Sequence, residues 1–356
     1  MGTSTDETVA RRTLPHRTFL DRWGGVFNAS GARGFFGEGY WFHGLAAPFG
    51  LRYEGSTFVA KTTTLYPREG NMPLTRQFGP KRILPDCIVV KPRAGVALNA
   101  VGLSGPGAEV LIDRWRNVLH GKRFVVSFMA IGKTPNERVA EVASFVELMR
   151  PFVEAMGTDN LGLQVNFSCP NVGLDPSHLV GEVDASLDRT AALGIMTMLK
   201  VSALVPPEVA CKLSAHHGCH AVVCSNTIPW GQLPDQIDWR GLFGTDVSPL
   251  ARFGGGGLSG RPLLPIVEQW IRDACSAGLK KPIVGGGGIL SKEDAEGLIM
   301  AGATAVELGS VSMLRPWRVA GIIAHVNRLH ERSRRIGEYM DRQMNHAASK
   351  ADRVSS

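Results

Sequence analysis

The sequence predicts a single (β/α)8 TIM barrel, and three observations support this fold class. From about Lys122 onward, short apolar runs alternate with stretches of helical composition. The runs are continuously apolar, which is typical of parallel strands that are covered on both faces. A doubly wound sheet would need a Gly-x-Gly-x-x-Gly turn after an early strand, and the sequence has none there.

The individual elements follow from these patterns. We expect strands over Phe124–Ala130, Leu161–Asn166, Met196–Val201, Ala221–Ser225, Pro282–Val284 and Ala305–Leu308. We expect helices near Asn136–Met156, Ala185–Leu193, Pro206–His216, Leu263–Ala277, Lys292–Ala301 and Trp317–His330. Two earlier runs, Phe58–Thr62 and Val96–Asn99, would bring the strands to the eight that a barrel of this size needs.

The domain organisation follows from the length of 356 residues, which one barrel with insertions accounts for. We expect a flexible N-terminal segment over residues 1–22, the barrel over 23–330, and a helix end with a polar tail over 331–356. The long irregular segment Thr227–Gly260 follows the sixth strand. Connectors of this length are usually functional, so we expect an element that contacts a ligand or partner there.

Composition and charge exclude several classes of protein. The sequence has no 18-residue apolar run and no apolar stretch near its start, so we expect neither a membrane span nor a signal peptide. Six cysteines are too few for a disulfide-rich secreted scaffold, and a cytoplasmic location is expected. The net charge of +7 is not gathered into a basic stripe, so nucleic-acid binding is not expected.

Polar residues end most of the expected strands. In a barrel these ends meet at one mouth, where function is found. Buried polar groups need partners, and a planar ligand rich in amides and carboxylates would supply them. The residues concerned are Lys61, Asn99, Asn166, Lys200 and Asn226.

Two glycine-containing turns follow the last two strands, at Gly285–Gly288 and Gly309–Ser310. Glycine lets backbone N–H groups approach an anion closely, and the last two strand ends of barrels often hold a phosphate. The alternative is that these turns only pack tightly. The pair in this order favours a phosphate site.

Cys169 lies just after the fourth expected strand, Leu161–Asn166, in the motif Asn166-Phe-Ser-Cys-Pro-Asn171. It could be a small buried hydrophobe, as most free cysteines are, or a thiolate that acts as a base. No Cys-x-x-Cys spacing occurs, and His216, His217 and His220 suit a surface helix cap better than ligands, so no metal site is expected.

These residues also lie in motifs that resemble the dihydroorotate dehydrogenase family, from about Val26 to Val326. Any one motif is weak, but nine in the family's order are a strong signal. They are Asn28-Ala-Ser-Gly31, Lys61-Thr-Thr-Thr with Arg68-Glu-Gly-Asn71, Asn99-Ala-Val-Gly-Leu103, Asn166-Phe-Ser-Cys-Pro-Asn171, Lys200, Ser225-Asn-Thr227, Gly257-Leu-Ser-Gly260, Gly285–Ile289 and Leu308-Gly-Ser310. Cysteine at position 169 resembles the soluble class 1 enzymes.

The resemblance implies a non-covalent FMN and the oxidation of dihydroorotate to orotate in pyrimidine biosynthesis. It implies that Cys169 removes the C5 proton, that hydride passes from C6 to flavin N5, and that Lys200 faces the N1–C2=O edge of the flavin. The FMN-binding residues it implies are Ala29, Ser30, Gly31, Lys61, Thr62, Asn99, Asn166, Lys200, Gly257, Gly260, Gly287, Gly288, Gly309 and Ser310. The implied substrate-binding residues are Lys61, Asn99, Gly102, Leu103, Asn166, Asn171, Asn226 and Thr227.

The chain departs from the family pattern at Ser104-Gly105, in the aromatic segment 35–43 and in the insertion 228–253. A paralogous flavin oxidoreductase acting on another dihydropyrimidine or cyclic amide is therefore one alternative. A non-redox phosphate-binding barrel enzyme and a non-catalytic relative that binds partners are others. The resemblance further implies a homodimer and allows an electron-transfer partner subunit; fumarate, a quinone or NAD through that partner could accept the electrons.

Overall fold

A closed parallel barrel forms the body of the protein. The computed structural model describes residues 14–167 and 176–354. Within them, eight strands form one sheet in the order β1-β12-β11-β8-β7-β6-β5-β2, all neighbours being parallel. The strands are β1 (Val26–Asn28), β2 (Phe58–Val59), β5 (Phe124–Phe128), β6 (Leu161–Asn166), β7 (Met196–Val201), β8 (Ala221–Cys224), β11 (Ile283–Gly286) and β12 (Ala305–Leu308).

The first and second strands close the barrel. The Thr57 N–H donates to the Val26 carbonyl at 2.8 Å, and the Asn28 N–H donates to the Thr57 carbonyl at 3.2 Å. The Asn28 side chain completes the junction, because its Nδ2 donates to the Val59 carbonyl at 2.8 Å and its Oδ1 accepts from the Val59 N–H at 3.1 Å. The predicted fold class is therefore confirmed.

One strand was assigned to the wrong sheet. Val96–Asn99 is β4 of a separate antiparallel sheet, in the order β3-β4-β10-β9, and the eighth barrel strand is β1 instead. Only four residues, 92–95, connect β3 (Ile88–Lys91) to β4, which suits a hairpin, whereas a parallel neighbour needs a long crossover. With three residues, β1 is too short to show a periodicity.

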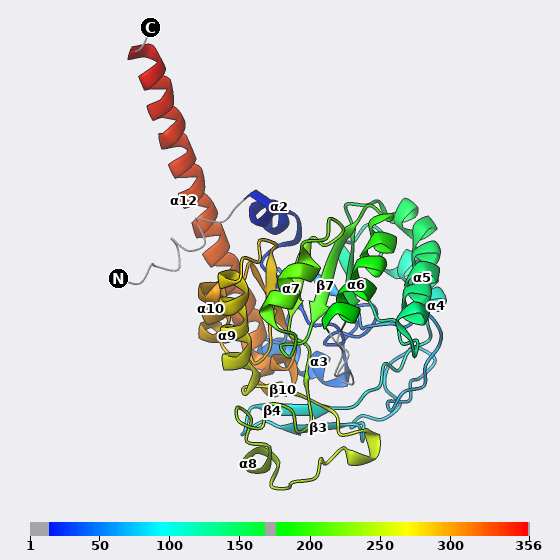
Figure 1. Cartoon of the computed structure of the whole chain (residues 1–356). Coiled ribbons are helices and arrows are strands. Elements are labelled where there is room, and N and C mark those ends of the chain that lie inside the picture. Colours follow the sequence, from blue (N-terminus) through cyan, green and yellow to red (C-terminus); the bar gives the residue numbers. More distant parts are fainter. Residues whose placement is uncertain (1–13, 168–175, 355–356) are drawn as a thin grey trace.

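The insertion after the sixth barrel strand supplies part of this small sheet and packs on it. It contributes β9 (Ile228–Pro229), α8 (Trp239–Phe243), the 3-10 turn η2 (Ala251–Phe253) and β10 (Gly257–Gly260). The rings of Trp230, Trp239 and Phe243 pack together, with the Trp230 centroid 4.8 Å from Trp239 and 5.1 Å from Phe243. The insertion thus has an apolar core of its own, and Figure 1 shows the small sheet across one end of the barrel.

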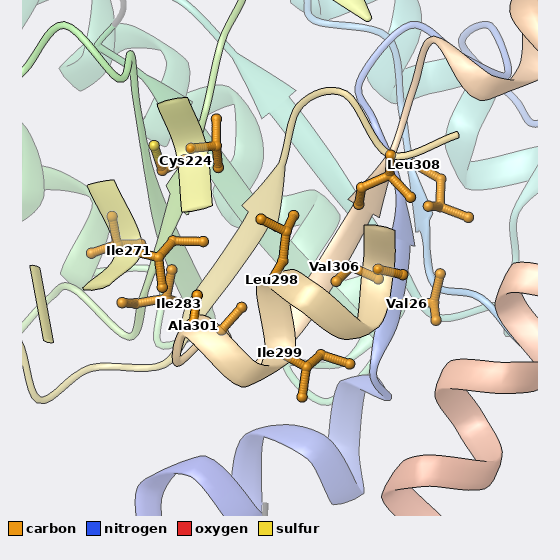
Figure 2. Close-up of a cluster of buried hydrophobic side chains, with 14 of the residues drawn as sticks. Val26, Cys224, Ile271, Ile283, Leu298, Ile299, Ala301, Val306 and Leu308 are labelled. Atoms are coloured by element: carbon orange, nitrogen blue, oxygen red, sulfur yellow. The ribbon is translucent and has the colours of Figure 1, made fainter. Parts of the chain in front are cut away.

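Helices cover the outside of the barrel. They are α4 (Ala108–Val118), α5 (Pro135–Met156), α6 (Pro176–Ala191), α7 (Pro207–Ser214), α9 (Leu263–Ser276), α10 (Lys292–Ala301) and α12 (Val319–Val354), with short α3 (Trp41–Ala46) and α11 (Val311–Leu314) near the mouth. Figure 2 shows Ile271, Leu298 and Ile299 of α9 and α10 against Ile283 and Val306 of the strands, so this apolar layer lies between helices and sheet. No helix in the described part of the chain is long and apolar enough to cross a membrane.

Helices extend into both of the segments that we expected outside the barrel. Residues 14–23, part of the segment that we expected to be flexible, form α2 (Leu14–Trp23) and bury Phe19 and Trp23. Helix α12 continues beyond His330 and extends away from the barrel (Figure 1). Glu331 pairs with Arg334 and Arg335, and such pairs one helical turn apart stabilise an exposed helix.

Candidate active site

The inside of the barrel changes from apolar to polar along its axis. Near the amino ends of the strands, α2 and the inward side chains of Phe27, Val59, Val125, Met198 and others form an apolar layer. One step further along each strand, in the period-2 pattern of inward positions, come four polar side chains. These are Ser127 on β5, Gln164 on β6, Lys200 on β7 and Glu307 on β12, all buried.

Three of these side chains form an ion-pair network. Lys200 Nζ lies 2.6 Å from Glu307 Oε2, and the two side chains are 5% and 2% exposed. Gln164 Nε2 donates to the other Glu307 oxygen at 3.1 Å. The network holds the Lys200 ammonium at the centre of the polar layer.

A second network holds Asn166 at the end of β6. Its Nδ2 donates to Thr62 Oγ1 at 3.1 Å and to Ser127 Oγ at 3.0 Å. Ser30 Oγ lies 2.7 Å from Thr62 Oγ1, which joins the ends of β1, β2 and β6. Both of these contacts use Nδ2, and among the described residues no donor pairs with the amide carbonyl of Asn166, which suits it to accept a hydrogen bond from a ligand.

Lys61, which follows β2, is a second buried cation. Its Nζ donates to the Ser104 carbonyl and lies 4.6 Å from the centroid of the Phe35 ring. Burial lowers the pKa of Lys61 to about 8, and the nearby Cys87 and Glu38 offset a part of this effect. The aromatic segment 35–43 thus contributes a ring to the candidate site.

The loop after β4 carries Asn99, Gly102 and Leu103. Asn99 Nδ2 donates to the Gly257 carbonyl at 3.4 Å, across the β4–β10 pair. Gly102 and Leu103 both have positive φ, at 70° and 60°. Arg68 Nε donates to the Gly102 carbonyl at 2.8 Å, which ties the loop to the segment after β2.

The segment after β8 lies beside this loop. Asn226 follows β8, and its N–H donates to the Val201 carbonyl at 3.2 Å, so it sits beside the end of β7. A Cβ on Gly257 would lie 2.1 Å from Thr227 Oγ1. Asn99, Thr227 and Gly257 are therefore brought together.

The glycine turns form a backbone cradle above β11 and β12. Gly288 has φ +79°, and a Cβ there would lie 2.6 Å from the Leu264 nitrogen and 2.9 Å from the Gly260 carbonyl oxygen. Gly287 has φ +137°, and a Cβ on Gly309 would meet Ala29 at 3.0 Å. Gly288 therefore packs directly against the backbone of Gly260 and Leu264, while Gly309 packs against Ala29.

The cradle also has unused hydrogen-bond donors. Among the described residues, no protein acceptor takes the backbone N–H of Gly287, Gly288, Gly309 or Ser310. Ala29, Ser30 and Gly31 lie beside it after β1, with Tyr40 Oη donating to the Gly31 carbonyl at 2.6 Å. Donors of this kind fit a phosphate group.

Two predicted site residues, Cys169 and Asn171, lie outside the described residues. The three histidines lie at the other end of the barrel, around the turn before β8. His216 Nδ1 accepts from the Gly218 N–H at 3.0 Å, and its Nε2 lies 3.1 Å from Asp188 Oδ1. Together with His217, these side chains bring three possible metal-ligand atoms within 4.8 Å of one another, so the structure gathers here residues for which the sequence predicted no metal site.

Sequence reasoning gave no role to Ser127, Gln164, Glu307 or Phe35. A signal for the first three was present. Each is a single polar residue inside an otherwise apolar strand that is buried on both faces, as in Ala305-Val-Glu-Leu308. Phe35 offered no comparable signal, because its contact with Lys61 depends on how the loop after β1 folds back.

Comparisons with known proteins identify the family of the chain. A family model described as dihydroorotate dehydrogenase matches residues 24–329. A dihydroorotate dehydrogenase B (NAD(+)) catalytic subunit from Cutibacterium acnes is 30% identical over 84% of this chain and 86% of its own length. A dihydroorotate dehydrogenase A (fumarate) from Lacticaseibacillus paracasei is 30% identical over 85% of this chain and 93% of its own length.

A solved structure supports the fold. The crystal structure of DHODH in complex with ferulenol from Eimeria tenella matches with a TM-score of 0.54 and 19% identity, over 91% of this chain and 82% of that one. Together with the family model, which spans the whole barrel, these relatives show that the chain belongs to the dihydroorotate dehydrogenase family, whose members are flavin-containing oxidoreductases acting on a CH–CH bond.

Proposed function

We propose that this protein is an FMN-dependent oxidoreductase that converts dihydroorotate to orotate. The observation that carries the proposal is the meeting of a phosphate cradle and a buried polar layer at one end of the barrel. The cradle offers N–H groups for a phosphate, and the layer offers Lys200, Asn166 and Lys61 to a planar ring. An anionic, amide-rich ligand matches these groups.

In this proposal, Gly287, Gly288, Gly309 and Ser310 hold the FMN phosphate. Ala29, Ser30 and Gly31 line the flavin ring with Thr62, while Gly257 and Gly260 border it from β10. Lys200 faces the N1–C2=O edge of the flavin. When it is bound, FMN supplies an acceptor for hydride at N5.

The protein's own residues orient the substrate and move one proton. Lys61 binds the substrate carboxylate by charge, and Asn99, Asn166, Asn171 and Asn226 pair with the ring amides, with Thr227, Gly102 and Leu103 completing the pocket. Cys169, in the manner of the class 1 enzymes, removes the C5 proton while hydride leaves C6. The thiolate form of the cysteine is the base.

The test uses the purified, FMN-loaded protein under anaerobic conditions. We expect dihydroorotate to bleach the flavin absorbance near 450 nm. A Cys169→Ser variant should bind FMN equally well but bleach at least about 100-fold more slowly, because a positioned base typically contributes 10²–10⁴-fold. A colourless protein would contradict the proposal, and full activity of the variant would contradict the role of Cys169.

A paralogous activity on another dihydropyrimidine or cyclic amide is the second candidate. Gly105 and Phe35 favour it, because a Cβ on Gly105 would meet the Phe35 ring at 3.2 Å, so that an aromatic side chain takes space beside Lys61. Bleaching by another dihydropyrimidine, with no bleaching by dihydroorotate, would select this candidate.

The electron acceptor and the assembly are further parts of the proposal. Relatives named for NAD(+), fumarate and quinone have 30%, 30% and 31% identity, so identity does not separate the acceptors. We propose a homodimer, with an electron-transfer partner subunit as the alternative. Reoxidation of the bleached flavin by each acceptor, and the molar mass in solution, distinguish these possibilities.

A further inference from the structure

Lys200 is not an isolated cation. Its ammonium lies 2.6 Å from the Glu307 carboxylate, and both side chains are buried. Two opposite charges at this separation act on a third group as a dipole, whose field is weaker than that of the ammonium alone. The charge that a ligand at the barrel mouth meets therefore depends on Glu307 as much as on Lys200.

Both side-chain oxygens of Glu307 are engaged in hydrogen bonds within the polar layer. Oε2 accepts from Lys200 Nζ, and Oε1 accepts from Gln164 Nε2 at 3.1 Å. Ser127 Oγ donates to Gln164 Oε1 at 3.2 Å, which fixes the orientation of the amide so that its NH₂ faces Glu307. Both oxygens of Glu307 therefore accept hydrogen bonds from described residues, as the oxygens of a carboxylate in an ion pair do.

Glu307 lies directly below the cradle. It is the inward residue of β12, two positions before Gly309, and its register partner on β11 is Gly286. A Cβ on Gly286 would lie only 3.3 Å from Glu307 Oε2, so no side chain from that position covers the carboxylate. The ion pair is thus adjacent to the space proposed for the flavin.

We propose that Glu307 lowers the reduction potential of the bound flavin by neutralising Lys200. This inference rests on the proposed FMN site. Hydride brings two electrons and one proton to N5, and the reduced ring is left with a negative charge at N1–C2=O. A lone buried ammonium beside that edge stabilises the charge, whereas an ammonium that is already paired stabilises it much less.

The test is the two-electron reduction potential of the FMN-loaded protein, measured spectroscopically against reference dyes. In Glu307→Gln, the shape is kept and the negative charge is lost. We expect the equilibrium constant for flavin reduction to rise at least about ten-fold, which equals about 30 mV for a two-electron couple. The variant should still bind FMN, because the phosphate cradle is unchanged.

Glu182→Gln is the matched control. Glu182 is also a buried carboxylate in an ion pair, with Arg138 at 2.5 Å, but it lies between the outer helices α5 and α6. Its loss should leave the potential unchanged. An unchanged potential in Glu307→Gln, or an equal rise in Glu182→Gln, would overturn the proposal.

A double variant covers the case in which Glu307→Gln fails to fold. Lys200→Met with Glu307→Gln removes both charges, and such replacements of buried pairs are often tolerated. If Glu307 neutralises Lys200 in the wild type, removing both charges should change the equilibrium constant for flavin reduction by no more than about three-fold. A fall of ten-fold or more would mean that Lys200 acts as a free cation and would overturn the proposal. A wild type that binds no FMN would instead contradict the proposed function.

Discussion

At the scale of single residues, Lys61 offers a test by pH. Its folded pKa of about 8 lies below the ordinary value of 10.5 because the side chain is buried. In the proposed role the cation binds the substrate carboxylate. Affinity for orotate should therefore be high below pH 8 and fall as the pH rises through 8 and Lys61 loses its proton.

We expect about a ten-fold rise in the orotate dissociation constant per pH unit above 8, read from the flavin spectrum of the FMN-loaded protein. Lys61→Met should bind orotate weakly at every pH and show no such dependence. Lys91→Met is the control, because Lys91 donates to the Leu242 carbonyl within the small sheet, away from the cradle. An unchanged pH profile in Lys61→Met would remove Lys61 from the substrate site.

The folded state binds fewer protons than the unfolded chain between pH 8 and 10.5, because the pKa of Lys61 is lowered by folding. The contribution of this residue to stability therefore rises with pH across that window and is constant on either side. This stability effect has the opposite direction to the expected effect on orotate affinity. The pH dependence of stability and the pH dependence of orotate affinity therefore report on Lys61 independently.

At the scale of elements, the cradle after β11 depends on the backbone of Gly288. In Gly288→Ala, the new Cβ would lie 2.6 Å from the Leu264 nitrogen, in a residue with φ +79°. The turn has to move, and we expect the FMN dissociation constant to rise at least about ten-fold, equal to about 1.4 kcal/mol. Titration of the apoprotein with FMN, followed by flavin fluorescence, measures it.

Gly278→Ala is the control that distinguishes a general effect of backbone strain from a specific effect on the cradle. Gly278 has φ +92° at the end of α9, but a Cβ there meets nothing within 4 Å. Both variants should lose about 1–3 kcal/mol of folding free energy from backbone strain. Only Gly288→Ala should lose affinity for FMN, and equal losses in both would argue against a phosphate at this turn.

At the scale of the whole molecule, we expect one end of the barrel to contribute stability and the other end to bind the ligands. Trp23 of α2 closes the end opposite the candidate site and is 2% exposed. Trp23→Ala should lower the free energy of unfolding by about 3–5 kcal/mol, because it leaves a large cavity. FMN and orotate affinities should not change, because the mouth is at the other end of the strands.

Denaturation by urea measures the stability, and Trp317→Ala is the control. Trp317 is 55% exposed, so its removal should change the free energy of unfolding by no more than about 0.5 kcal/mol. A loss of FMN affinity in Trp23→Ala at temperatures where the variant stays folded would show that the two ends are coupled.

Much of the fold could be predicted from the sequence, because a parallel strand covered on both faces is a continuous apolar run. Leu161–Asn166, Met196–Val201 and Ala305–Leu308 were predicted to the residue. Val96–Asn99 shows where this signal ends. A buried strand has the same composition in either sheet, and only its partners, β3 and β10, assign it to the small antiparallel sheet.

The same division between sequence and tertiary structure holds for the candidate site. The sequence by itself determined that Lys61, Asn99, Asn166, Lys200 and the two glycine turns lie at or near strand ends, although Asn99 ends a strand of the small sheet. Only the tertiary structure decided that Glu307 pairs with Lys200 and that the Phe35 ring lies against Lys61, although these pairs are 107 and 26 positions apart in the chain. The physical reason is that strand patterns record which way a side chain faces, whereas its electrostatic partner is set by barrel closure and by loops that fold back over the mouth.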